Sequence, residues 1–190
     1  MYAQLNHTKS MNMSKGWERQ ACPWAVVTCV SASGYSLPLT MIFSWKRISE
    51  KLQQEELPGT CFECSDNGWI NQELYLKWFH FFLNNIPPAC PVLFLQDGHG
   101  SHISLQVIEV ARCHNVHLLC LSTHTTHPLQ LLDVGVFRSL KINFSKACKE
   151  YLPANPGQVI TTNHFAQLLA QAWPPAVTPV NIMSGFKETP

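Results

Sequence analysis

The sequence predicts a mixed α/β domain, and three observations support this fold class. Short runs of β-branched and apolar residues alternate with stretches in which apolar residues recur every three or four positions, the patterns of strands and amphipathic helices. The chain has 190 residues, the size of one domain or of one domain with a tail. Hydrophobic residues form 46% of it, enough to fill a core, so the composition excludes an intrinsically disordered protein.

A β-hairpin is expected in the first part of the chain. Residues 24–30 and 37–43 are rich in β-branched and apolar side chains, and 31–36 between them contains the Ser and Gly residues of a turn. The polar stretch 46–67 is expected to be a loop or a short helix, with a turn at its Pro-Gly dipeptide.

A buried helix and a strand–helix unit follow the hairpin. Aromatic and aliphatic residues at three- or four-residue spacing predict a helix over 72–84 that is buried on most of its circumference. The run 92–95 has the continuous apolar character of a central strand. Ser101 is the expected N-cap of a second helix, which reaches Arg112. Its inward-facing residues are expected to be Ile103, Val107 and Val110.

The remaining pattern predicts one more buried strand and two helices. The apolar run 117–121 is interpreted as a buried strand, followed over 122–129 by a loop rich in Thr, His and Pro. Asp133 begins a long helix, in which apolar residues repeat at three or four as far as Tyr151. A shorter helix near 164–172 and a Pro-rich end complete the domain.

Charge and hydropathy limit the kinds of partner. Charged residues form only 13% of the chain and the formal net charge is +1, so any contact with nucleic acid must come from a local basic stripe. The stretches 21–45 and 151–186 lack charge, but prolines and polar residues interrupt both, so neither is expected to span a membrane. The first residues lack the pattern of a signal peptide, so we expect an intracellular protein whose eight cysteines are free thiols.

Two of the three aspartates are candidate metal ligands. Asp97 follows an apolar strand and precedes a glycine, and Asp133 stands at the start of a long helix. Carboxylates that converge from such positions can hold Mg²⁺ or Mn²⁺, which prefer oxygen ligands, and two such ions support phosphodiester cleavage. The alternative is structural: Asp97 caps a turn, and Asp133 is an ordinary helix N-cap.

Histidines and cysteines raise a weaker zinc hypothesis. Cys61 and Cys64 form one Cys-x-x-Cys pair, and six of the nine histidines form three His-x-x-His pairs. A structural zinc site needs two matched pairs at a defined spacing, and no second Cys pair exists. The histidine pairs are 99/102, 114/117 and 124/127, which fall in different expected elements, so polar loop histidines are the competing interpretation.

A basic stripe on the long C-terminal helix is a candidate surface for nucleic-acid phosphates. Arg138, Lys141 and Lys149 are spaced so that they share one helical face. A solvent-exposed face without a ligand gives the same spacing, so both interpretations stay open.

Three segments together resemble a known family. Residues 97–109 read Asp-Gly-His-Gly-Ser-His-Ile-Ser-Leu-Gln-Val-Ile-Glu, 119–127 read Leu-Cys-Leu-Ser-Thr-His-Thr-Thr-His, and 132–137 read Leu-Asp-Val-Gly-Val-Phe. Their order and spacing are similar to those of the DDE superfamily endonuclease domain, in particular of pogo/Tigger/Jerky-type transposases and the host proteins derived from them. The resemblance extends over roughly 23–190.

The resemblance implies a ribonuclease H-like mixed sheet flanked by helices, and a metal-dependent endonuclease that acts on DNA. Asp97 matches the second catalytic aspartate of the family and Asp133 the third, with Mg²⁺ or Mn²⁺ as the expected cofactor. A nuclear location follows from the DNA substrate of the family. The expected parts of the chain are an unassigned segment over 1–22, the DDE-type core over 23–152, and a helical, Pro-rich extension of the same domain over 153–190.

One part of the family pattern is missing. The first catalytic aspartate should stand on the first strand, upstream of the hairpin, in a segment that resembles Asp-Glu-Thr-Gly, and 1–22 does not contain this motif. We therefore expect an incomplete sheet without its first strand, and little or no cleavage of DNA by this chain alone. A sheet that lacks a central strand exposes an edge on which another chain can pair.

The resulting functional expectation has two rivals. We expect a transposase-derived DDE domain with weak, non-specific DNA binding and reduced or lost strand cleavage. One rival is an active nuclease that recruits a substitute acid, Glu18 or Asp66, or a strand of a partner chain. The other is a non-catalytic, domesticated protein-interaction module whose docking surface is the exposed sheet edge.

Overall fold

Six strands form one mixed sheet at the centre of the molecule. The computed structural model describes residues 2–8, 24–44, 57–87, 91–97, 100–121, 132–161 and 164–188, of which 2–8, 24, 101, 133–134 and 188 are described by their backbone alone. The sheet order is β4-β3-β2-β1-β5-β6. The strands are β1 Tyr2–Thr8, β2 Trp24–Ser31, β3 Thr40–Phe43, β4 Cys61–Cys64, β5 Val92–Asp97 and β6 Val116–Leu121.

The sheet has the ribonuclease H-like arrangement that the family resemblance implies, with one correction. Strand β2 runs antiparallel to β1 and β3, whereas β1, β5 and β6 are parallel to one another. The expectation that the first strand is absent was wrong, because β1 lies between β2 and β5. The run Tyr2–Thr8 mixes polar and apolar residues, and only its hydrogen bonds to two neighbours identify it as a strand.

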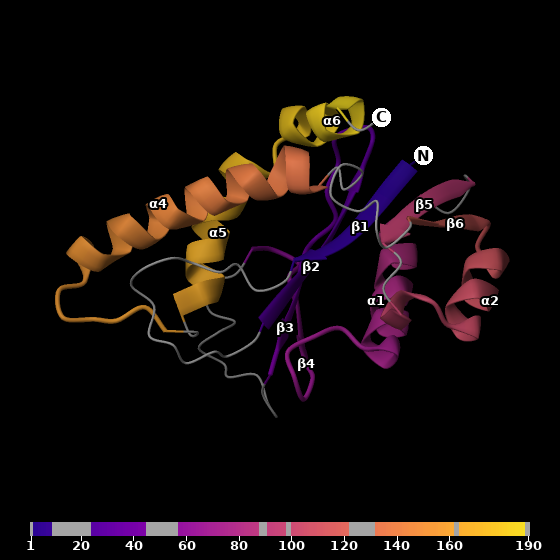
Figure 1. The fold of residues 1–190 in the computed structure, drawn as a ribbon, viewed down its shortest axis with the longest axis horizontal. Coiled ribbons are helices and arrows are strands. Elements are labelled where there is room, and N and C mark those ends of the chain that lie inside the picture. Colours follow the sequence, from indigo (N-terminus) through magenta and orange to yellow (C-terminus); the bar gives the residue numbers. More distant parts are fainter. Residues whose placement is uncertain are drawn as a thin grey trace.

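Helices cover both faces of this sheet (Figure 1). Helices α1 and α2 lie on one side, and α4 and α5 lie on the other, with α6 beyond the start of α4. The helical elements are α1 Gln72–Asn84, η2 Gly100–His102, α2 Leu105–Cys113, the π-helix η3 Asp133–Phe137, α4 Arg138–Ala154, α5 Phe165–Ala176 and α6 Pro179–Glu188. No helix in the described part of the chain combines the length and apolar character needed to cross a bilayer.

Alternation along the strands divides the core in two. In β2, Val26 and Val30 belong to the cluster beneath α4 and α5, whereas Val27 and Cys29 belong to the cluster beneath α1 and α2. Successive residues of a strand point to opposite faces, so one apolar run supplies both cores. Strand β2 therefore has no polar face, and its continuous apolar run was the signal that identified it as a strand.

The α1 side is packed mainly by aromatic rings. The side chains of Tyr75, Phe79 and Phe82 are fully buried on α1, and Phe94 of β5 meets Phe82 at a centroid distance of 4.7 Å. Asn71 caps the helix, because its side chain accepts a hydrogen bond from the amide of Leu74 at 2.8 Å. The predicted helix over 72–84 is therefore confirmed at both ends.

The helix expected from Ser101 begins later than predicted. Residues Gly100–His102 form a 3-10 turn, and α2 starts at Leu105 with Ser104 as its cap, whose hydroxyl accepts from the amide of Val107. Ile103 was expected to face the core but is 47% exposed, because it lies before the helix rather than on its inner face. Two serines three positions apart offer equivalent caps, so the sequence alone did not distinguish them.

Strand β6 differs from the buried strand that the apolar run predicted. It is an edge strand, and Leu119 is 47% exposed. A continuous apolar run is typical of a strand between two others, but pairing only with β5 leaves much of β6 in contact with solvent.

Two short elements were not predicted. Strand β4 lies inside the stretch expected to be loop, and it pairs with β3 at the opposite edge of the sheet from β6. Helix α6 lies in the Pro-rich end, for which no separate helix was predicted, and Pro179 is its first residue, a position that proline favours.

Candidate functional site

Asp97 is the last residue of β5, where a parallel strand presents polar groups beyond the sheet. The register of β1 against β5 pairs Leu5 with Gln96, so the next step brings Asn6 level with Asp97. On its other side Asp97 is paired with Leu121 of β6. The carboxylate therefore stands at the end of a central strand, beside an amide residue on β1 rather than a second acid.

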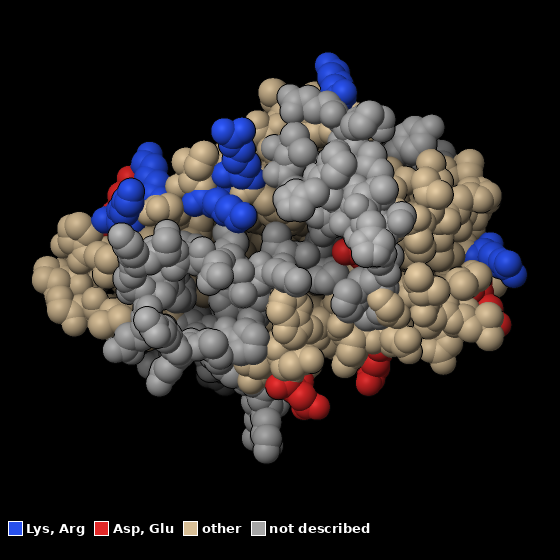
Figure 2. Space-filling view, viewed as in Figure 1, with Lys and Arg blue, Asp and Glu red and all other residues tan. Residues whose placement is uncertain are grey.

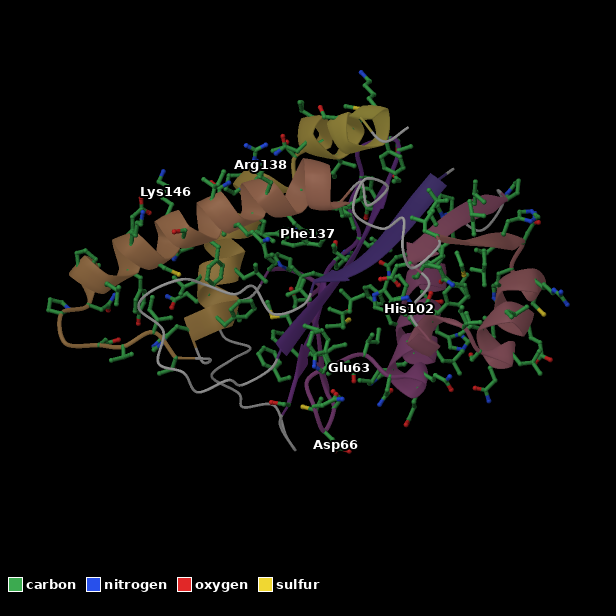
Figure 3. All side chains as sticks on the ribbon, viewed as in Figure 1. Glu63, Asp66, His102, Phe137, Arg138 and Lys146 are labelled. Carbon is green, nitrogen blue, oxygen red and sulfur yellow. The ribbon has the colours of Figure 1, made fainter. Side chains whose placement is uncertain are left out.

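A buried histidine holds this carboxylate. Nδ1 of His102 lies 2.6 Å from Oδ1 of Asp97, and the His102 side chain has no exposed surface. The imidazole stacks on the ring of Tyr75 at a centroid distance of 4.5 Å and an interplanar angle of 26°. Figure 3 shows His102 on the α1 side of the sheet. An ionised carboxylate only accepts hydrogen bonds, so Nδ1 is the donor of any hydrogen bond in this contact.

A second buried polar residue ties the histidine turn to the sheet. Gln96 is 1% exposed, and its side-chain amide donates to the backbone carbonyl of His102 at 3.4 Å and to Sγ of Cys120 at 3.0 Å. The hydroxyl of Tyr75 donates to the Gln96 side-chain oxygen. Burial raises the pKa of the Tyr75 phenol well above its ordinary value, and nearby Cys120, Cys29 and Asp97 raise it further, so this hydroxyl keeps its proton.

Asp133 begins the π-helix η3 on the other face of the sheet. Its side chain lies outside the described residues, as do Gly98 and His99. Val136 and Phe137 of η3 are buried in the core under α4 and α5, which fixes this segment on that face. π-Helical turns occur frequently at functional sites, because the extra residue redirects the side chains of one turn.

A glycine contact sets how closely α6 approaches η3. A Cβ added to Gly135 would lie 2.5 Å from the carbonyl oxygen of Asn181 and 3.0 Å from Cα of Gly185. Only glycine therefore fits at position 135 with α6 in its present place. The position of the segment that carries Asp133 depends on this contact.

The chemistry of the two aspartates suits a hard divalent cation. Carboxylate oxygens are the ligands that Mg²⁺ and Mn²⁺ prefer, and one oxygen of Asp97 is in contact with the His102 imidazole. Among the side chains that the structure describes, no group of three or more His, Cys, Asp and Glu could hold a metal ion. Asp97 and Asp133 are the residues that would hold Mg²⁺ or Mn²⁺ according to the family resemblance.

Asp66, one of the two candidate substitute acids, does not join this site. Asp66 follows β4, which lies four strand positions from β5 in the sheet order, a separation of roughly 19 Å. Figure 3 shows Asp66 beyond β4, away from His102. Glu18, the other candidate, lies outside the described residues.

The Cys-x-x-Cys pair is extended and therefore unsuited to one zinc ion. Cys61 and Cys64 are the first and last residues of β4, so their Cα atoms are about 10 Å apart at the rise of a strand. Both are free thiols, and burial raises the pKa of Cys64, as does the charge of Glu63. Of the histidine pairs, His114 and His117 are both exposed, at the end of α2 and on β6.

The basic residues expected on the last long helix all lie on α4 and are all exposed. Figure 2 shows Lys and Arg side chains gathered over this helix, and Figure 3 shows Arg138 and Lys146 on its outer side, directed away from the sheet. Lys146 approaches Glu150 at 3.9 Å, and both side chains are more than 60% exposed. The residues expected to contact phosphates are Arg138, Lys141 and Lys149.

The sequence interpretation missed the polar residues behind Asp97. His102 was noted only as a member of the pair 99/102, and neither Tyr75 nor Gln96 was considered as part of a site. Gln96 had a detectable signal, because an amide within an otherwise apolar strand needs a buried hydrogen-bond partner. Tyr75 had none, since its spacing is that of any core aromatic residue.

Comparisons with known proteins identify the family. A sequence model of the DDE superfamily endonuclease matches residues 23–186. The chain is 30% identical over 162 residues to "MFS-type transporter clz9" of Cochliobolus lunatus, which is 83% of this chain and 18% of that protein. The chain thus spans less than a fifth of the length of this relative.

Solved structures of a transposase are also similar to the chain. One is the Mos1 transposase paired-end complex with left transposon end, at 12% identity and a TM-score of 0.49, covering 99% of this chain and 55% of that one. Another is the Mos1 transposase catalytic domain and raltegravir with Mn, at 12% identity and a TM-score of 0.47, covering 100% of this chain and 83% of that one.

Proposed function

The chain belongs to the DDE superfamily endonucleases, and we propose that it is a transposase-derived domain that binds DNA weakly while cleaving strands poorly or not at all. The catalytic residues of this proposal are Asp97 and Asp133. They would share Mg²⁺ or Mn²⁺, and the proposed place of action is the nucleus.

The observation that carries the proposal is the register at the end of β5. Leu5 of β1 pairs with Gln96, so the next residue, Asn6, is expected level with Asp97 on the strand to which the family pattern assigns its first aspartate. An amide offers a neutral oxygen, which attracts a divalent cation less strongly than a carboxylate does. The first strand is thus present, whereas the acid expected on it is replaced.

The roles of the residues follow from this arrangement. Asp97 supplies one carboxylate, kept in place by His102, and Asp133 supplies the other from η3. Bound cations of this kind activate the attacking hydroxyl and neutralise charge on the phosphate. With two carboxylates and one amide, the domain would hold such ions loosely, and cleavage would be slow for that reason.

DNA binding is assigned to the exposed basic face of α4. Arg138, Lys141 and Lys149 lie within about one quarter of the circumference of this helix at 3.6 residues per turn. The formal net charge of the chain is only +1, so a local stripe of this kind must provide the phosphate contacts. Such contacts carry no sequence information, and the binding is expected to be non-specific.

Restoring the missing acid tests the cleavage part of the proposal. In Asn6→Asp, nicking of supercoiled plasmid in Mn²⁺ should rise clearly above that of the wild type, because a third carboxylate completes the site. Gln4→Asp is the matched control, since it adds the same charge to β1 two residues farther from Asp97 and should leave nicking unchanged. Equal nicking by both variants, or nicking that survives Asp97→Asn, would contradict the proposal.

Salt dependence tests the DNA-binding part. Replacing Arg138, Lys141 and Lys149 together by Ala should weaken binding to duplex DNA and reduce the slope of log affinity against log salt by up to about 0.9 for each phosphate contact. Lys77→Ala is the control, because Lys77 pairs with Glu63 at 2.6 Å on a different part of the molecule. An unchanged slope in the triple variant would exclude this face.

The alternative function, a non-catalytic protein-interaction module, is favoured by one observation. Among the strands that the structure describes, β6 lies at the edge of the sheet and pairs with β5 alone, and its Leu119 is 47% exposed, so another chain can extend the sheet there. If β6 pairs with a second copy, sedimentation velocity should detect a concentration-dependent dimer that Leu119→Lys abolishes. A monomer at all concentrations would argue against this self-pairing.

A further inference from the structure

We propose that His102 is a positioning residue that holds the Asp97 carboxylate in the orientation required for a divalent cation. This inference rests on the proposed function, because it takes Asp97 to be a cation ligand. It assigns a role to a residue outside the pair of candidate ligands, and it explains why a buried imidazole stands beside the end of a strand.

The first argument is the geometry of the contact. At 2.6 Å, Nδ1 of His102 and Oδ1 of Asp97 are in direct polar contact. Asp97 is only partly buried, with 14% of its side chain exposed, whereas His102 has no exposed surface. The histidine is therefore the fixed partner, and the carboxylate is the group whose orientation it selects.

The second argument is that neighbouring residues contact both the ring and the backbone of His102. Its ring stacks on Tyr75, which is fully buried on α1. Its backbone carbonyl accepts a hydrogen bond from the buried amide of Gln96, the residue next to Asp97 in β5. A rotation of the ring would lose both the stacking and the contact with Asp97, so the pair moves as a unit with the sheet.

A third contact fixes the turn that carries the histidine. The side-chain amide of Gln72, at the start of α1, donates to the carbonyl of Gly100 at 3.5 Å. The 3-10 turn η2 is thus attached to α1 through Gln72 and to β5 through Gln96. The turn η2 next to Asp97 is thus bonded to both α1 and β5.

The contact between His102 and Asp97 should affect the affinity for a cation as well as the stability of the fold. A carboxylate already restricted to one rotamer loses less side-chain entropy when it binds a metal ion. Groups that hydrogen-bond to metal ligands typically change metal affinity by about 10- to 100-fold when removed. Loss of the Nδ1 donor should therefore weaken Mn²⁺ binding even when the domain stays folded.

Three variants of His102 separate the contact of its Nδ1 from the packing of its ring. His102→Phe keeps an aromatic ring against Tyr75 and removes the donor. His102→Asn places an amide donor near the position of Nδ1, whereas His102→Gln places the same amide near the position of Nε2. If the Phe variant fails to fold, Mn²⁺ affinity can still be compared between the Asn and Gln variants, which differ in the position of the amide donor.

The experiment is a titration of the purified full chain with Mn²⁺, in which free Mn²⁺ is measured by electron paramagnetic resonance. Relative to the wild type, affinity should fall about 10- to 100-fold in His102→Phe and His102→Gln, and His102→Asn should recover most of it. Thermal unfolding without metal checks that each variant folds. Equal Mn²⁺ affinity in the wild type and a folded Phe variant, or equal loss in Asn and Gln, would overturn the role of His102.

Asp97→Asn distinguishes failure of this inference from failure of the proposed function. If Asp97→Asn binds Mn²⁺ as the wild type does, the cation assignment itself is wrong, and the positioning role falls with it. If Asp97→Asn loses binding while all His102 variants keep it, the cation site stands and only the positioning role is excluded.

Discussion

Different physical means hold the two segments that carry the candidate aspartates. Around the end of β5, aromatic rings and a chain of buried polar groups surround His102, which contacts Asp97. Around η3, which begins at Asp133, a mixed aliphatic and aromatic core and a close glycine contact with α6 fix the backbone. Contact with a buried imidazole orients one carboxylate, whereas the other depends on the approach of two backbones, so the two segments should respond to different substitutions.

Gly135→Ala should have the largest effect, and it acts on the α4 side. The new methyl group would lie 2.5 Å from the Asn181 carbonyl oxygen, so α6 or η3 must move, at a cost of about 3 kcal/mol in the free energy of unfolding. Gly100→Ala is the control, because nothing lies within 4 Å of an added Cβ there. Urea unfolding measures both, and a Gly135→Ala protein as stable as Gly100→Ala would refute the contact.

Tyr75→Phe tests the polar chain on the α1 side with a smaller effect. It removes the hydroxyl that donates to Gln96, and leaving that buried oxygen unsatisfied should cost about 1–2 kcal/mol of unfolding free energy. Tyr35→Phe serves as the control, because Tyr35 is 59% exposed. An unchanged unfolding free energy in Tyr75→Phe would show that the chain is unimportant for stability.

The same variant predicts a pH dependence. The pKa of the Tyr75 phenol is raised above its ordinary value of 10.0 in the folded state. The unfolded chain therefore loses this proton first, and the stabilisation present below pH 10 declines as the pH rises further. The stability difference between the wild type and Tyr75→Phe should accordingly shrink above pH 10 in urea unfolding. A difference that grows there would contradict the raised pKa.

Cys120 should give the smallest effect, because it is the outermost link of the polar chain. Gln96 donates to its sulfur at 3.0 Å, and sulfur is a weak acceptor, so Cys120→Ala should cost only about 0.5 kcal/mol. Cys120→Ser retains an acceptor and should be close to the wild type. A loss of more than 2 kcal/mol in either variant would mean that this edge of the sheet is more strongly coupled to the core than the account allows.

The sequence predicted the periodic helices on both faces of the sheet, α1 on one face and α4 and α5 on the other. Helix α1 and strands β2 and β3 have strong apolar periodicity, and local preference agreed with tertiary packing there. The end of β5 was also found, because an acid and a glycine follow an apolar run. These features are local in sequence and need no knowledge of neighbouring strands.

The features that were missed depend on contacts between distant segments. Strand β1 is polar in part and becomes a strand only through pairing with β2 and β5. Helix α6 contains few strong helix formers at its start and is fixed by its approach to Gly135. The contact between His102 and Asp97 forms because the turn η2 folds back onto β5. The spacing of these two residues along the chain does not reveal it.

The most direct test of the central claim is the Mn²⁺ affinity of Asn6→Asp beside that of the wild type and Gln4→Asp, each measured by electron paramagnetic resonance. If Asn6 and Asp97 border one cation site, the added carboxylate should tighten Mn²⁺ binding by about tenfold or more in Asn6→Asp alone. Identical affinities in all three proteins would mean that the end of β5 is not the cation site.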